Sequence, residues 1–236
     1  MGHRRRGLTA PVAHEGILPL VLLGLTATTG VVDSVSYLAL GHVFTANMTG
    51  NVVFLGFAAA GAEGLSIARS GLALAAFLGG ALIGGRLATV MGGGARHRWI
   101  AAAFAVEAAL LAAAVAAAAG SARPFSSHAI RLYVIIILTG LAMGVRNATV
   151  RTLAVPNLTT TVLTLTLAGL AADSTLAGGG SPGWARRTAS VVTMFAGAAA
   201  GAWLLRYSVA LPLAVSSAVA CGCATAAYFA TRLTTD

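Results

Sequence analysis

The chain of 236 residues is 58% hydrophobic and only 9% charged, whereas a soluble domain averages roughly 25% charged residues. All fifteen basic residues are arginines, and the net charge at pH 7 is +9. The arginines stand at the ends of apolar segments rather than on one polar face. The composition therefore predicts an all-α polytopic membrane protein, and it argues against a nucleic-acid-binding domain or a separate soluble domain.

Eight apolar segments follow one another, and the turns between them are rich in Gly, Ser, Pro and Arg. We predict them at 17–40, 47–61, 66–90, 98–120, 130–154, 157–173, 187–206 and 209–231. They form a single membrane domain, 17–231, between an N-terminal tail, 1–16, and a C-terminal tail, 232–236. The N-terminal arginines resemble the start of a signal peptide, but no small-residue cleavage pattern follows, so we expect an uncleaved first span.

The second and sixth segments are too short to cross a bilayer. About fifteen helical residues reach roughly 22 Å, whereas the hydrocarbon layer is about 30 Å thick. If both segments enter and return on the same side, one face of the membrane collects Arg4, Arg5, Arg6, Arg86, Arg96, Arg98, Arg146, Arg151, Arg186, Arg187 and Arg232. The other face keeps Arg69, Arg123, Arg131 and Arg206. Because arginine accumulates on the cytoplasmic side, we predict six full spans, two re-entrant half-helices and cytoplasmic termini, with eight short crossings as the alternative.

Two stretches read as diverged copies of one motif. Residues 30–33 and 47–53 correspond to residues 144–147 and 157–163. Each half of the chain would hold three spans and one half-helix, and an odd number of crossings inverts the second half relative to the first. The two halves are 17–120 and 130–231.

Glycines four residues apart recur at matching places in the two halves. Small residues at this spacing let helices approach closely in lipid. We expect them to serve packing within the chain, with a homodimer through these faces as the weaker alternative. The pairs are Gly80 with Gly84, Gly140 with Gly144, and Gly197 with Gly201.

Two carboxylates lie inside apolar segments, where an unpaired charge is costly. The repeat sets Asn147 opposite Asp33, so we expect the neighbouring Arg146 to pair with Asp33. The alternative is that Asp33 and Arg146 lie near the interface and meet water. Glu107, near the middle of the fourth segment, has no obvious partner in the sequence. It is a candidate for proton coupling, or for a structural hydrogen bond in its protonated form.

The sequences Asn-Met-Thr and Asn-Leu-Thr stand at the start of the two short segments. Asn and Thr are preferred N-cap residues because their side-chain oxygens accept bonds from free backbone N–H groups. A half-helix that starts within the membrane directs the positive end of its dipole into a cavity. We therefore expect a central site for an anionic or hydrogen-bond-accepting solute, formed by Asp33, Asn47, Thr49, Asn51, Arg146, Asn147, Asn157 and Thr159.

Cysteine and histidine patterns give no sign of metal binding or catalysis. Cys221 and Cys223 are two residues apart and do not share a helix face, so we interpret them as packing residues. His42 lies in the turn after the first segment, and no nucleophile–base pair is visible. We expect no metal, no cofactor and no enzyme activity.

The first motif copy, TGVVDSVSYL at 29–38 followed by VFTANMTGN at 43–51, resembles the signature of the YoaK-like family of bacterial membrane proteins. The sequences GVRNA at 144–148 and TTVLT at 160–164 are similar to its second signature. The resemblance implies a bacterial inner-membrane protein of about six spans, and it implies no substrate, because the function of the family is unknown. Arg146 departs from the family pattern, in which a neutral residue is common at this position.

Three classes of function fit these features. The first is a small-solute transporter or channel with a central site between the half-helices. The alternative is a membrane scaffold or sensor that transports nothing, and the third is an intramembrane enzyme. The expected partners are the lipid bilayer and a small solute.

Overall fold

A computed structural model describes residues 18–91, 96–120, 130–153 and 163–230, and over these ranges its regular secondary structure is entirely helical. The elements follow the predicted segments closely. They are α1 (Leu18–Ala39), α2 (Met48–Ala59), α3 (Ile67–Met91), α4 (Arg96–Ala118), α5 (Ile130–Leu153), α6 (Leu163–Ala172), the 3₁₀ turn η1 (Thr175–Ala177), α7 (Trp184–Leu204) and α8 (Ala210–Ala230).

Five of the described helices are long and apolar enough to cross a membrane by length and composition: α1, α3, α4, α5 and α8. Helix α7 is of similar length, with 21 residues, but Arg186 and Arg187 stand in its first turn. Helices α2 and α6 are short, with 12 and 10 residues. The polytopic helical class is confirmed, while the division into six crossing and two re-entrant helices stays a prediction.

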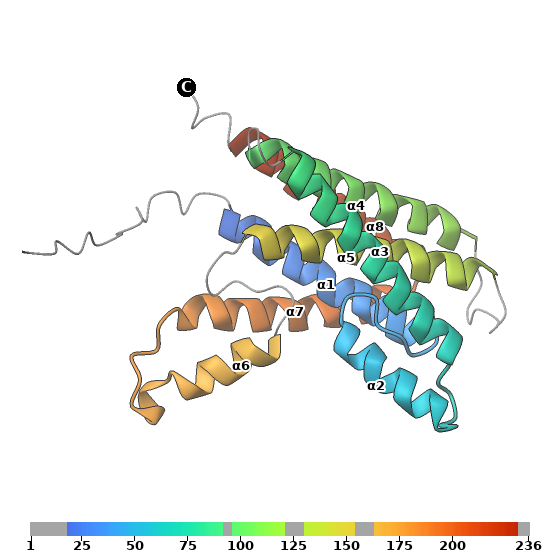
Figure 1. The fold of residues 1–236 in the computed structure, drawn as a ribbon, viewed down its shortest axis with the longest axis horizontal. Coiled ribbons are helices and arrows are strands. Elements are labelled where there is room, and N and C mark those ends of the chain that lie inside the picture. The colour runs from blue at the N-terminus through green and yellow to red at the C-terminus, as the bar shows by residue number, and fades with distance from the viewer. Residues whose placement is uncertain (1–17, 92–95, 121–129, 154–162, 231–236) are drawn as a thin grey trace, which may run out of the picture.

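The long helices alternate in direction along the chain (Figure 1). Helices α1, α4 and α7 run from left to right in that view, and α3, α5 and α8 run from right to left. Helix α2 begins near the middle of the molecule and runs outward to the lower right. Helix α6 also begins near the middle, and it runs outward to the lower left. The two short helices therefore point toward opposite ends of the molecule.

The main helix contacts join the two halves of the chain. Helix α1 packs against α7 and α8, α3 packs against α5, and α4 packs against α8 and α5. Glycine permits the closest of these approaches. A Cβ atom at Gly144 would overlap the carbonyl oxygen of Phe77 in α3, and one at Gly197 would overlap that of Ala27 in α1. The α1–α7 and α3–α5 contacts thus both depend on glycines that let the two backbones approach closely.

The glycine pairs predicted from the sequence lie in these contacts. Gly80 and Gly84 face α5, Gly140 and Gly144 face α3, and Gly197 and Gly201 face α1. The expectation that they pack within the chain is confirmed. Since these faces are occupied in one molecule, a homodimer stays a prediction that would need another surface.

Candidate functional site

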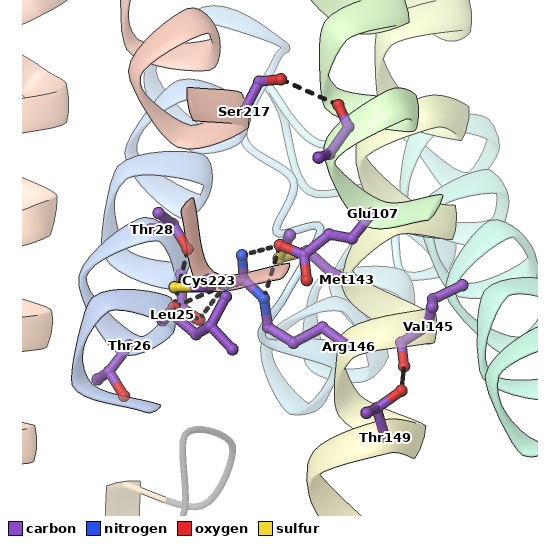
Figure 2. A network of polar contacts seen from close by, with 12 residues as sticks. Leu25, Thr26, Thr28, Glu107, Met143, Val145, Arg146, Thr149, Ser217 and Cys223 are labelled. Atoms are coloured by element: carbon purple, nitrogen blue, oxygen red, sulfur yellow. Dashed lines mark hydrogen bonds and ion pairs between the residues drawn. The ribbon is translucent and has the colours of Figure 1, made fainter. Parts of the chain in front are cut away.

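A buried ion pair joins the long helices near the centre of the bundle. Arg146 of α5 and Glu107 of α4 are both 0% exposed. The Nε of Arg146 donates to Oε1 of Glu107 at 3.0 Å, and Nη2 donates to the same oxygen. Nη1 donates to the carbonyl oxygen of Leu25 at 2.7 Å and to the hydroxyl of Thr29 at 2.9 Å, both in α1 (Figure 2). One guanidinium therefore ties α1, α4 and α5 together.

Arg146 pairs with a different residue from the one predicted, and it lies in the interior rather than at a membrane face. The repeat alignment pointed to Asp33, whereas direct packing of α4 on α5 brings Glu107 to the guanidinium. The alternative, in which both residues meet water, is wrong for Arg146, which is fully buried, whereas Asp33 is 7% exposed and lines a cavity. Because Arg146 is buried, it does not count among the arginines that indicate the cytoplasmic face. Glu107 accepts hydrogen bonds from Arg146, rather than acting as the predicted protonated donor.

The surroundings of the ion pair are polar on the side of α1. The hydroxyls of Thr28 and Thr29 donate to the carbonyl oxygen of Leu25, the same atom that accepts from Arg146. Oε2 of Glu107 is buried and has no hydrogen-bond partner among the described residues. A buried pair contributes little net stability when its desolvation is counted, but breaking it leaves an uncompensated charge.

Asp33 lies in a second polar centre, where α1 meets the segment that leads into α2. Its Oδ1 accepts a hydrogen bond from the backbone N–H of Ala46 at 2.9 Å. Asp33 thus holds the chain at the entrance to α2, a role that the sequence assigned to the side chain of Asn47.

The predicted asparagines and threonines have separate roles. Asn47 is the N-cap residue of α2, as predicted, but its side chain makes no capping hydrogen bond. The side-chain amide of Asn51 instead makes two hydrogen bonds to the backbone of Phe44. Its Oδ1 accepts from the N–H of Phe44 at 2.9 Å, and its Nδ2 donates to the carbonyl oxygen of Phe44. Asn147 donates to the carbonyl of Met143 in its own helix at 2.8 Å, and Thr49 is exposed. Asn157 and Thr159 lie outside the described residues.

A cavity of about 350 Å³ lies between α1, the start of α2 and α7. Its lining includes Asp33 and Asn47, so the structure brings these two predicted site residues together. The sequence reasoning missed the other lining residues that carry chemistry, which are Ser34, Tyr37, Phe44 and Met194. Ser34, Tyr37 and Phe44 lie within the signature sequences 29–38 and 43–51, and this membership was the available signal.

Other features of the described residues offer less chemistry. A groove of about 630 Å³ between α4 and α8 is lined mainly by alanines. Within the described ranges, no group of three or more His, Cys, Asp or Glu side chains converges to hold a metal ion. The Asp33 cavity and the Arg146–Glu107 pair are therefore the candidate functional sites.

Apolar helices of membrane-spanning length around a buried ion pair and a polar cavity define a polytopic α-helical membrane protein. The family model described as "Protein of unknown function (DUF1275)" matches residues 21–227, and the chain belongs to this family. It is similar to the UPF0700 transmembrane protein YoaK of Bacillus subtilis (strain 168), with 38% identity over 170 residues, 70% of this chain and 69% of the relative. The predicted YoaK-like resemblance is confirmed. No solved structure matches.

Proposed function

We propose that this chain is a small-solute transporter of the bacterial plasma membrane, with its substrate site in the cavity between α1, α2 and α7. The observation that carries the proposal is a buried carboxylate, Asp33, on the wall of a cavity of about 350 Å³. Ionisable groups within membrane helices usually face a partner or a pathway, and small-molecule sites are concave with a few polar groups.

The proposed topology has six full spans, two re-entrant half-helices and cytoplasmic termini, arranged as an inverted repeat. Support comes from the opposite courses of α2 and α6 away from the middle of the molecule (Figure 1). It also comes from the matched α1–α7 and α3–α5 contacts and from the arginine bias of the sequence. In this arrangement the start of α2 lies at membrane depth beside Asp33.

The proposed site retains Asp33 and Asn47 as substrate-binding residues. Arg146 is assigned a positioning role, since its donors are engaged by Glu107, Leu25 and Thr29. A role for Glu107 in proton coupling is a separate proposal. It is supported by Oε2, which lacks a partner among the described residues.

Flux measurements on the full chain in lipid vesicles test the proposal. Vesicles are loaded with small anions, amines and neutral solutes, and the loss of each solute is compared with protein-free vesicles. We expect at least one class to leave faster through the wild-type chain and to be retained by Asp33→Asn and Asn47→Ala. The control is Glu63→Gln, which removes an exposed carboxylate between α2 and α3 and should leave flux unchanged.

The scaffold or sensor alternative predicts a different result. In that case the wild-type chain inserts normally and moves none of the solutes faster than protein-free vesicles. Normal flux in both Asp33→Asn and Asn47→Ala would contradict the proposed location of the site.

A further inference from the structure

The wall of the Asp33 cavity carries a carboxyl group and no basic side chain among the described residues. Asp33 is the one lining residue with a formal charge among the described residues. No described Arg or His forms an ion pair with it, because the donors of Arg146 are directed to Glu107, Leu25 and Thr29. His42 packs edge-on against Tyr37 but does not line the cavity. A guest in this cavity therefore meets an acidic group with no fixed positive partner.

The Asp33 carboxylate and the Ser34 hydroxyl on the cavity wall favour a guest that donates hydrogen bonds over one that accepts them. The backbone N–H of Ala46 donates to the Asp33 carboxylate, so it is not free to bind an anion. The hydroxyl of Ser34 donates to the carbonyl of Val31 at 2.7 Å, so the lone pairs of the hydroxyl oxygen remain to accept a hydrogen bond from a guest. A carboxylate has about four acceptor positions, and the one hydrogen bond from Ala46 leaves room for the N–H groups of a guest.

Aromatic rings line the wall near the carboxylate. The rings of Tyr37 and Phe44 are stacked with centroids 5.2 Å apart and an interplanar angle of 20°. Phe54 extends the stack, with its ring centroid 5.6 Å from that of Phe44. Rings that stack on one another cover part of each other's faces, so they offer a guest mainly an apolar surface, against which the carbon body of a small organic cation can pack. The thioether of Met194 adds an adaptable apolar contact from α7.

We infer that the cavity binds a small organic cation, a protonated primary or secondary amine with a compact apolar body. Its ammonium group would donate to Asp33, and its body would lie against Tyr37 and Phe44. The cavity volume, about 350 Å³, is near the lower end of the roughly 300–1,000 Å³ found for small-molecule sites, which limits the guest to one ring or a short chain. This inference rests on the proposed transporter function and replaces the anionic solute that helix capping suggested.

Three probes with the same ring and different charge test the inference: benzylammonium, benzamide and benzoate. Each is titrated against the purified full chain in detergent while the unfolding temperature is recorded. We expect benzylammonium to raise the unfolding temperature by several degrees, because a ligand that binds the folded state stabilises it. Benzamide and benzoate at the same concentration should leave it unchanged. Stabilisation by benzoate, or none by benzylammonium, would overturn the inference.

Variants locate the bound cation. Asp33→Asn keeps an oxygen acceptor for the N–H of Ala46 and removes only the charge, so it should fold and bind benzylammonium roughly 10–100-fold more weakly. Tyr37→Leu removes one ring of the stacked wall against which the body of the guest would lie, and it should weaken binding by a smaller factor, about two- to fivefold. Ala202→Leu fills the cavity from α7 without changing charge and should also abolish the response. Glu63→Gln is the control and should bind as the wild-type chain does.

The vesicle assay separates this inference from the proposed function. Binding of benzylammonium without flux of any solute would support the cation site and contradict transport. Flux carried by anions or neutral solutes alone would support transport and contradict the cation site. A wild-type response retained in both Asp33→Asn and Ala202→Leu would show that the cation binds elsewhere and would overturn the assignment.

Discussion

Arg146 and Glu107 are joined across α5 and α4 by two hydrogen bonds to a single carboxylate oxygen, and neither side chain is exposed. The chain contains a second, contrasting pair. Arg187 of α7 donates to Asp173 just after α6 at 2.6 Å, with side-chain exposures of 17% and 44%. The two pairs share their chemistry and differ in burial.

This contrast predicts different costs for removing the two acids. Glu107→Ala leaves the guanidinium of Arg146 buried without its counter-charge, so it should lower the free energy of unfolding by about 3–5 kcal/mol. Asp173→Ala should lower it by less than about 1 kcal/mol, because solvent screens the partly exposed pair. Unfolding in mixed micelles, followed by circular dichroism, gives both values. Equal losses would show that burial does not set the cost.

Replacing both partners, as Glu107→Leu with Arg146→Met, should lower the free energy of unfolding by less than Glu107→Ala alone.

Adjacent glycines in α3 predict a test of close helix packing. A Cβ atom at Gly84 would lie 2.8 Å from the carbonyl oxygen of Val145, whereas one at Gly85 would meet nothing within 4 Å. Gly84→Ala should therefore destabilise the chain by about 1–3 kcal/mol through overpacking. Gly85→Ala should be neutral or stabilise it by up to about 1 kcal/mol, since alanine favours helix. The same micelle titration compares them, and similar values for both would contradict the observed α3–α5 contact.

The two asparagines near the start of α2 predict opposite results for stability. Asn51→Ala removes the partner of both backbone groups of Phe44 and should lower stability by about 1–3 kcal/mol. Asn47→Ala removes an exposed side chain that makes no capping bond, so stability should change by no more than about 0.5 kcal/mol. Limited proteolysis of the segment between α1 and α2 should be faster only in Asn51→Ala. If Asn47→Ala is the less stable variant, Asn47 acts as a cap in solution.

Cysteine labelling tests the proposed topology. In a chain carrying Cys221→Ser and Cys223→Ala, a cysteine at position 66, between α2 and α3, should react from outside intact cells with a membrane-impermeant maleimide. Thr89→Cys, near the other end of α3, should react only after the cells are permeabilised. Labelling of position 66 from the cytoplasmic side alone would support eight short crossings.

The positions of the helices were predictable because the signals are local. The predicted segment 17–40 is α1 at Leu18–Ala39, and 130–154 is α5 at Ile130–Leu153. In each case a long apolar run is bounded by residues that interrupt helices, and this information lies within the run itself. The polytopic class and the family resemblance followed from the same kind of local evidence.

The pairing of side chains was less predictable because it depends on which helices meet. The repeat alignment gave Asp33 and Arg146 as partners, but it contained no information that α4 lies directly on α5 and brings Glu107 within reach. Capping preference likewise marked Asn47 correctly as the N-cap residue, yet the backbone N–H of the preceding Ala46 is bound by Asp33, thirteen positions earlier in the chain. Both corrections arise from tertiary contacts that no periodicity encodes.

The partners of α1 have a consequence for how the protein is made. The described helices whose backbones approach that of α1 most closely all belong to the second half of the chain: α5, α7 and α8. The ribosome therefore delivers α1 to the membrane well before its partners exist, and the face at Gly30 stays in lipid until α7 is inserted. Each half alone lacks the close contacts of α1 with α7 and of α3 with α5. Two separately synthesised halves should complete each other only when both are present in the same membrane.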